Sequence, residues 1–308
     1  MDLINKNSRF NAYWMLSATA FFLACNHVIG RSIEGMIPPV GLSFWRWAVG
    51  AIILLPFVII RLRGSWLYYL QSPGVLVALS AMMVGSTTLV LVALNYTTAV
   101  NTSLINALQP TMTAFLAMIF LKERLNKIQW FGIFLGFVGV LIMVTKANWQ
   151  ILIKLQFNIG DLLVLLAVCG FSGYSLLLRS LPPQLNGSEK LFAIAVTGVV
   201  LLLPFYLWES TTVAPVSLTS HTLSVVLVLA LLVTVAGNAM WNRGIMIIGP
   251  SKAAMFINLI PLFGAILAVS WLGEVVEPYH LAGAIMVCTG IVCVIRKNGR
   301  QKGTDHHD

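Results

Sequence analysis

Charged residues are scarce in this chain. Asp, Glu, Lys and Arg make up 9% of its 308 residues, whereas 58% are hydrophobic. A soluble domain carries roughly a quarter of its residues charged, so this composition excludes a soluble globular protein. Acidic residues are fewer than basic ones, 10 against 19, and none of the acidic residues lies in the middle of an apolar run. Because small multidrug exporters depend on such a central carboxylate, its absence argues against cation/proton antiport by that route.

Several kinds of functional motif are also missing. The four cysteines, Cys25, Cys169, Cys288 and Cys293, all lie inside apolar runs. This placement predicts buried free thiols, and argues against a disulfide framework or a metal site. The chain has no phosphate-binding loop, nucleophile elbow, zinc signature of His and Glu, or basic nucleic-acid patch. We therefore expect no enzyme, no cofactor, no metal, no nucleic-acid partner and no ATP-driven pump built from this chain alone.

Long apolar runs dominate what remains. Ten of them are long enough to cross a bilayer, which takes about 20 residues in a helix. The predicted spans are residues 12–31, 39–60, 74–95, 98–121, 127–145, 159–178, 190–208, 222–246, 251–272 and 278–296. The sequence therefore predicts an all-α integral membrane protein with ten transmembrane helices.

The basic residues are distributed unevenly between the two sides of these spans. When connections are assigned to alternate sides, 15 of the 19 Lys and Arg residues fall on one side and 3 on the other, with Arg46 inside a span. Cytoplasmic loops attract Lys and Arg. Both terminal tails, residues 1–11 and 297–308, are therefore expected in the cytoplasm, and the protein in a bacterial inner membrane.

The stretch Leu104 to Val140 occurs twice. A shift of 151 residues, without a gap, brings together Pro110 and Pro261, Glu123 and Glu274, Gly132 and Gly283, and Gly139 and Gly290. Coincidence is a poor explanation for Pro, Glu and two Gly in one register, so we infer two repeats of five helices, at 12–145 and 159–296. Five is an odd number, so the second repeat should be inverted, as is usual in alternating-access transporters.

Local sequences around this repeat resemble a known family. They are Lys122-Glu123-Arg124, Gly273-Glu274, the segment from Asn26 to Arg31, Phe44-Trp45-Arg46-Trp47, Trp241-Asn242-Arg243-Gly244 and Gly249-Pro250. With the ten spans and inverted halves, they resemble the EamA-domain exporters of the drug/metabolite transporter superfamily. The resemblance covers about residues 12–296 and implies export or exchange of amino acids, other small metabolites or toxic compounds. It names no substrate.

Arg46 and His27 are the ionisable residues predicted inside spans. A charge there costs at least a few kcal/mol unless it is paired or hydrated. Arg46 either lines a cavity and meets an anionic group, such as a carboxylate, or snorkels outward or holds carbonyls of neighbouring helices. His27 either carries protons or is hydrogen-bonded for packing.

Buried amides and aromatic residues complete the candidate site. Amides in hydrocarbon need partners, which are found either across helices or in a wet cavity. Two groups of Asn on opposite sides of the membrane midplane would suit paired gates: an external group of Asn95, Asn101 and Asn106, and a cytoplasmic group of Asn238, Asn242 and Asn258. Pro110 and Pro261 each free a carbonyl and are candidate hinges. The full set of candidate substrate-binding residues is Asn26, His27, Trp45, Arg46, Asn95, Tyr96, Asn101, Asn106, Gln109, Tyr174, Asn238, Trp241, Asn242 and Asn258.

These observations predict a secondary transporter that exports small metabolites such as amino acids through a central cavity between inverted repeats. Its partners would be a small-molecule substrate and the lipid bilayer, and it would act as a monomer or a homodimer. Two alternatives stay open: a multidrug or toxic-compound efflux protein with the same fold, and a membrane protein or enzyme that transports nothing. The sequence leaves the coupling ion and the net direction undecided.

Overall fold

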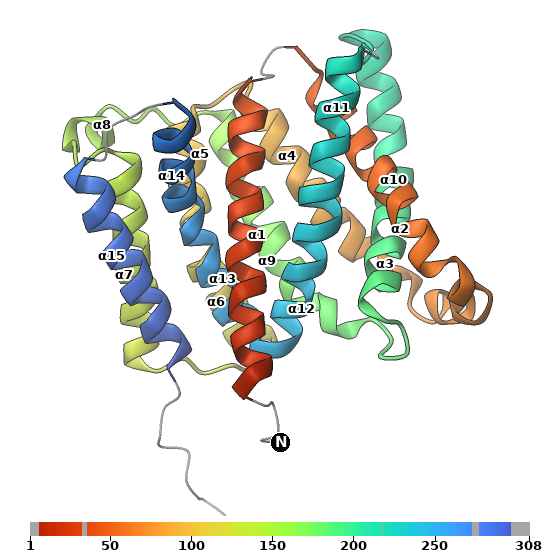
Figure 1. Ribbon diagram of the computed structural model, residues 1–308, viewed down its shortest axis with the longest axis horizontal. Coiled ribbons are helices and arrows are strands. Elements are labelled where there is room, and N and C mark those ends of the chain that lie inside the picture. The colour runs from red at the N-terminus through yellow and green to blue at the C-terminus, as the bar shows by residue number, and fades with distance from the viewer. Residues whose placement is uncertain (1–5, 33–35, 218, 273–276, 297–308) are drawn as a thin grey trace, which may run out of the picture.

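The computed structural model describes residues 6–32, 36–217, 219–272 and 277–296, and these form helices joined by turns (Figure 1). In chain order the elements are α1 Lys6–Ser32, α2 Pro39–Leu70, α3 Pro73–Ser80, η1 Ala81–Gly85, α4 Ser86–Ala93, α5 Ala99–Asn106, α6 Gln109–Phe120, α7 Lys127–Val144, α8 Trp149–Ile153, α9 Ile159–Leu177, η2 Leu178–Ser180, α10 Gly187–Thr212, α11 Ser220–Leu229, η3 Ala230–Gly237, α12 Asn238–Ile248, α13 Pro250–Ala254, η4 Met255–Leu259, α14 Ile260–Leu272 and α15 Pro278–Ile295. The predicted turn residue Glu274 and the C-terminal tail 297–308 lie outside the described part of the chain.

The described residues contain ten helical stretches that are long and apolar enough to span a membrane, which confirms the predicted fold class. Six of the ten are essentially one helix. The other four are assembled from shorter segments: α3–η1–α4, α5–α6, α11–η3–α12 and α13–η4–α14. The third, fourth, eighth and ninth spans are thus the irregular ones.

These irregularities recur in the two halves of the chain. The third span contains the π-helical segment η1, and the eighth span contains the π-helical segment η3. The shift of 151 residues brings Ala81, the first residue of η1, into η3. The fourth span breaks between α5 and α6, where Pro110 begins the second segment, and the ninth passes through the 3-10 segment η4 just before Pro261. Both prolines therefore lie at interruptions in a helix, where a missing backbone donor costs little.

Carboxylates in the described residues lie at helix ends, where they accept backbone amides. Asp161 and Glu189 form capping boxes that begin α9 and α10. Glu209, on α10, accepts the amides of Val40 at 3.1 Å and Gly41 at 2.7 Å, which begin α2. A negative charge at a helix N-terminus satisfies free N–H groups and the helix dipole. These carboxylates therefore hold helices in place.

The prediction that all four cysteines are buried is wrong for Cys288. The four thiols are free, but only Cys25 is buried, whereas Cys169 and Cys293 are partly buried and Cys288 is exposed. Cys288 lies on the face of α15 turned away from the other helices. In a membrane-spanning helix an apolar thiol needs no protein around it, because lipid is as apolar as the core.

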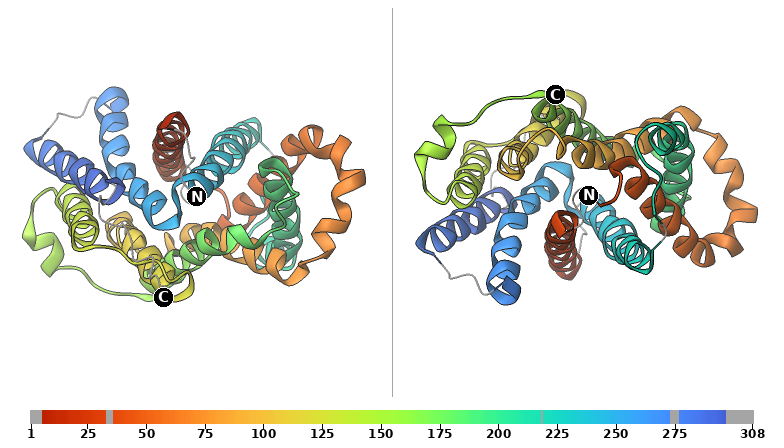
Figure 2. Two further views of the ribbon diagram at one scale, coloured as in Figure 1. Left: turned by 90° about the horizontal axis from the view of Figure 1, so that it is seen from below. Right: turned by 90° about the horizontal axis from the view of Figure 1, so that it is seen from above.

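Helices α7 and α15 form the closest pair in the molecule, side by side at one edge of the bundle in Figure 2, with α2, α3 and α10 at the other. A Cβ added to Gly132 would lie 2.7 Å from the carbonyl oxygen of Gly290, and one added to Gly139 would lie 2.8 Å from that of Gly283. The early glycine of each helix thus meets the late glycine of the other, so the helices are antiparallel. Backbones approach this closely only where side chains are absent.

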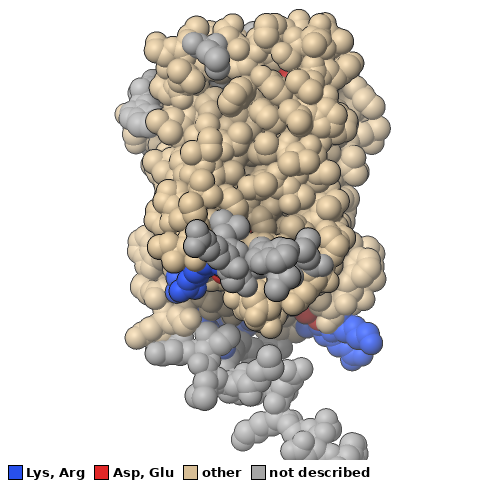
Figure 3. All heavy atoms as spheres, turned by 90° about the vertical axis from the view of Figure 1, so that its right-hand side faces the viewer, with Lys and Arg blue, Asp and Glu red and all other residues tan. Residues whose placement is uncertain are grey.

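Basic side chains gather toward one end of the bundle, as Figure 3 shows for one face. We call this the basic end; α1 begins there and α15 ends there (Figure 1). The opposite end carries the turn between α4 and α5 and the capping residue Asp161 of α9. This unequal distribution is the pattern from which the sequence predicts a cytoplasmic basic end.

We predict that Gly290→Ala destabilises the protein and Gly264→Ala does not. A Cβ on Gly290 would lie 2.6 Å from the Gly132 carbonyl oxygen, whereas a Cβ on Gly264, also within a helix, has no atom within 4 Å. Overpacking of this kind costs about 1–3 kcal/mol, while Ala in place of Gly favours a helix interior. Thermal unfolding of the two purified variants in detergent measures the difference. Equal midpoints would show that α7 and α15 do not need this close approach.

Candidate functional site

Three connected chambers run through the interior. The outer chamber, about 600 Å³, lies between α1, the α4–α5 turn and α14, and reaches the opposite end at Gly30 and Thr98. The middle chamber, about 110 Å³, shares Asn26, His27 and Asn106 with it. The deep chamber, about 30 Å³, shares Arg46 and Phe171 with the middle one and continues to Asn238 and Trp241. Because neighbouring chambers share walls, we call the series the path; the chamber volume decreases from the outer to the deep chamber.

The walls of the outer chamber are mixed in character. Aliphatic side chains from α1, α4 and α14 form most of the surface, among them Val28, Leu91 and Ile260. Hydroxyl and amide groups interrupt it, including Thr98, Thr102, Ser103, Asn106 and Asn258. A large cavity with an apolar surface and a few placed polar groups is the usual form of a small-molecule site.

Arg46 occupies the junction of the middle and deep chambers. Its neighbours on α2 fix the helix against α4: Ser43 shares a 2.7 Å hydrogen bond with the hydroxyl of Thr88, and the indole of Trp47 donates to Thr87 at 3.3 Å. The guanidinium is buried, at 2% exposure, and its Nη1 donates to Asn26 Oδ1 at 3.4 Å. Arg46 therefore does not snorkel outward, because both its helix and its chamber hold it inside.

Buried polar atoms without a protein partner concentrate on these walls. Among the described residues they include Arg46 Nε, Gln109 Nε2, Trp241 Nε1, Thr102 Oγ1 and both side-chain heteroatoms of Asn258. All of these residues line one of the three chambers. Because a buried polar group without a partner costs about 1–3 kcal/mol, their clustering marks the chambers as a place for polar ligand groups.

Below the deep chamber, polar contacts close the path. The hydroxyl of Tyr174 donates to Asn242 Oδ1 at 2.7 Å, and both side chains are buried. Asn238 donates to the carbonyl of Thr234 at 3.0 Å on its own helix. Tyr174 and Asn242 were predicted to bind substrate, but in this structure they lie beneath the chambers and face each other.

Other candidate residues are not brought to the chambers. Asn101 donates to both carboxylate oxygens of Asp161, at 3.1 Å each, and so ties α5 to α9. Trp45 donates to the hydroxyl of Tyr206 on α10 at 3.2 Å. Asn95 and Tyr96 are exposed in the turn after α4. The two predicted Asn groups are also divided differently, because Asn258 lies with Asn106 on the outer chamber.

Sequence reasoning missed several residues of the walls. Thr87 and Phe171 line both the middle and deep chambers, and Thr98 and Thr102 line the outer one. A threonine in an apolar span can bond its own helix carbonyls, so it carries a weaker signal than an amide or a charge. The position of Phe171, one turn before the predicted Tyr174 on α9, was the available clue.

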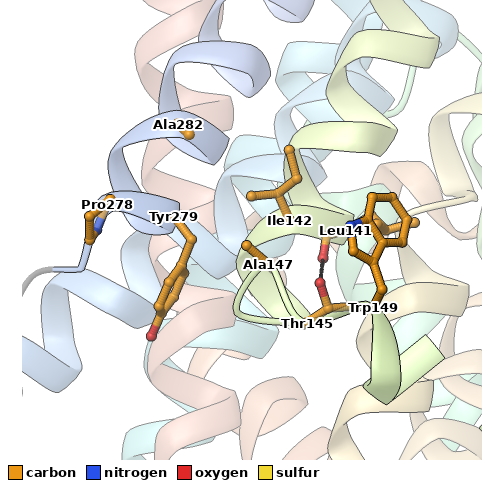
Figure 4. A pocket seen from close by; sticks show the side chains of 8 residues that line it. All are labelled: Leu141, Ile142, Thr145, Ala147, Trp149, Pro278, Tyr279 and Ala282. Carbon is orange, nitrogen blue, oxygen red and sulfur yellow. Dashed lines mark hydrogen bonds between the residues drawn. The ribbon is translucent and has the colours of Figure 1, made fainter. Parts of the chain in front are cut away.

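A second hollow, of about 450 Å³, lies apart from this path. It is bounded by the end of α7, the short helix α8 and the start of α15, and it shares no residue with the three chambers (Figure 4). Its walls are mainly apolar, and the Thr145 hydroxyl, which donates to the Leu141 carbonyl at 2.8 Å, is already satisfied (Figure 4). None of the described residues that line it is charged.

Comparison with known families agrees with this architecture. The model of the EamA-like transporter family matches the chain twice, at residues 10–145 and 158–296. The chain belongs to the EamA-like transporter family. The two matches end and begin close to the limits of the repeats inferred from the 151-residue shift. EamA membership also confirms the superfamily that the local motifs resemble.

Curated relatives are mostly known only as transporters. An uncharacterized transporter of Bacillus subtilis, YyaM, is 29% identical over 287 residues, covering 92% of each chain. A probable terminal-alkyne amino-acid exporter of Streptantibioticus cattleyicolor is 25% identical over 65% of each chain. A solved crystal structure of a protein, 15% identical, matches with a TM-score of 0.71 over 94% of this chain and 96% of that one, which shows a shared fold.

Two asparagines should respond oppositely to substitution. Asn101→Leu should lower the thermal midpoint, because it removes the hydrogen bonds to Asp161 and to the Gln156 carbonyl at 3.2 Å. Losing such bonds to a charged group costs about 1.5–3 kcal/mol. Asn258→Leu should leave the midpoint unchanged or raise it, since neither of its amide heteroatoms has a partner. Unfolding of both purified variants checks this, and a large loss in Asn258→Leu would contradict a ligand-facing amide.

Proposed function

We propose that this EamA-family protein is a secondary transporter that exports small metabolites, amino acids among them, by alternating access. The observation that carries this proposal is the series of three chambers with shared walls, the largest toward the end opposite the basic end and the smallest deepest in the bundle. A secondary transporter must offer its site to one side at a time. A path that reaches one surface and narrows to a closed end is what one of its two states requires.

Contacts between the two halves close the basic end. Glu123, in the turn after α6, accepts a 2.7 Å hydrogen bond from the buried hydroxyl of Ser251 on α13. Nearby, within the second half, Arg179 donates to the carbonyl of Ile245 on α12 at 3.1 Å. We name the Glu123–Ser251 pair the latch. With the basic end in the cytoplasm, as the charge distribution predicts, the outer chamber faces outside, the side on which an exporter releases its substrate.

The glycine contacts between the halves support an inverted relation of the repeats, and with it a second state. Gly132 contacts Gly290, and Gly139 contacts Gly283. Because the 151-residue shift pairs Gly132 with Gly283 and Gly139 with Gly290, each contact is repeated with the two halves interchanged. This is the contact pattern of a two-fold axis. In the second state we expect the roles of the halves to be swapped, with the outer chamber closed and the basic end open. Pro110 and Pro261, at the interruptions of the fourth and ninth spans, would absorb the change of angle as hinges.

Amino acids and related metabolites are favoured as substrates by two observations. Arg46 places a buried guanidinium within the path, and one relative is named as a probable amino-acid exporter. The aliphatic walls of the outer chamber favour toxic apolar compounds as the second candidate. Export is driven either by a substrate gradient or by protons, and His27 at the chamber wall is the available proton carrier. Measuring flux with and without a pH gradient decides between the two.

Counterflow in proteoliposomes tests the function directly. Vesicles are loaded with a pooled metabolite mixture, and exchange is followed by mass spectrometry for the wild type, Arg46→Ala and protein-free vesicles. We expect exchange of a few carboxylated compounds, reduced by at least tenfold in a folded Arg46→Ala protein. Exchange of apolar drugs alone would identify the efflux alternative. Absence of flux for every compound, from protein shown to be folded, would refute transport.

Breaking the latch should open the basic end. Ser251→Ala removes a hydrogen bond to a carboxylate, worth roughly 1.5–3 kcal/mol, and so should raise the open population by tenfold or more. Ser270→Ala is the matched control, because Ser270 bonds only its own helix, at the Ile266 carbonyl. Labelling of a cysteine placed at Asn238 in a cysteine-free background, with an impermeant reagent on the basic side, reports the opening. Equal labelling rates in both variants would remove the latch from the mechanism.

A further inference from the structure

The three chambers hold an unbalanced charge. Arg46 is the one formally charged side chain among the described residues that line them. The five carboxylates in the described part of the chain are used elsewhere, in capping boxes, in the α2 cap and in the latch, as found for Glu123, Asp161, Glu189, Glu209 and Glu277. None of these five lines a chamber, so the described walls of the path carry a positive charge and no negative one.

Donors for an anion are grouped in the middle chamber. A guanidinium has five N–H donors. In Arg46, Nη1 donates to Asn26 Oδ1 at 3.4 Å, and Nε has no protein partner. Gln109 lines the same chamber, is 6% exposed, and its Nε2 is also without a partner. A buried cation is strongly destabilising unless an anion and hydrogen bonds compensate it. These two side chains form a built site that lacks its acceptor.

We propose that the middle chamber is the carboxylate subsite of the transporter, and that its preferred substrates are amphipathic monocarboxylates. The inference rests on the proposed function and specifies its substrate class. The carboxylate accepts hydrogen bonds from Arg46 and Gln109, and the uncharged body of the substrate lies in the outer chamber. The volumes match this division, since about 110 Å³ admits a small head group and about 600 Å³ admits a larger apolar one.

The charges on the chamber walls also predict how affinity depends on the charge of the compound. An α-ammonium bound beside the carboxylate subsite would meet the amides of Asn26 and Asn106 but no described carboxylate. Amide oxygens accept its hydrogen bonds, yet they do not neutralise it, so the ammonium loses part of its hydration free energy. An acid that lacks the ammonium should therefore bind better than the corresponding amino acid. A cation without a carboxylate should bind worst.

Four compounds with one phenyl skeleton test the ranking: 3-phenylpropanoate, phenylalanine, 3-phenylpropanamide and phenylalaninamide. Affinities for the purified full-length protein in detergent are measured by calorimetry, and flux of the same compounds by counterflow. We expect affinity to fall in the order given, with the acid at least tenfold tighter than its neutral amide. Failure of the acid to bind, or equal affinity for acid and amide, would overturn the carboxylate subsite.

Variants separate recognition of the carboxylate from a role in folding. Arg46→Gln should weaken the acid by about tenfold to a hundredfold and leave the neutral amide within twofold, while Gln109→Leu should weaken the acid several-fold. Arg243→Gln removes an exposed charge near the basic end and serves as the control. Equal loss of all four compounds in Arg46→Gln would overturn the proposal in favour of a structural Arg46. Counterflow that persists without regard to charge would refute the subsite and leave the transport function standing.

Discussion

The cost of an unsatisfied polar group in hydrocarbon governs where this chain places its few charges. Carboxylates such as Asp161 and Glu209 are tied to backbone amides at helix ends, where the helix dipole and free N–H groups stabilise them. Arg46 stands apart, since it is buried within a span and has a single long hydrogen bond to a neutral side chain. These carboxylates are satisfied within the chain, whereas Arg46 keeps a buried Nε donor without a protein partner.

Regular and irregular spans occupy different places in the structure. The pair α7 and α15 is straight and packed backbone to backbone through glycines, which leaves little freedom for relative movement. The four spans that contain π or 3-10 segments or a break instead surround the chambers. Weak hydrogen bonding in such segments lets a helix change its path at low cost. In the proposed alternating-access cycle, we therefore expect the motion next to the chambers and little movement at the edge formed by α7 and α15.

The strongest sequence signals were those with a direct physical meaning in a bilayer. Apolar length predicted the ten spans, and an uncommon register of Pro, Glu and Gly predicted that 12–145 and 159–296 are related. The site was harder. Arg46, Asn26 and Gln109 do line the path, but Asn101 and Trp45 were equally conspicuous and proved to join helices. Sequence reveals that a polar group in a span needs a partner, whereas only packing decides whether that partner is another helix.

The proposed alternating-access cycle sets a limit on the strength of the contacts that close the basic end. An exporter must populate both orientations, so their free energies must lie within a few kcal/mol of each other. The Glu123–Ser251 bond joins the halves at the basic end and is worth roughly 1.5–3 kcal/mol. That is comparable to what a bound anion gains at a buried guanidinium, so in the proposed cycle occupation of the middle chamber would decide which end is open.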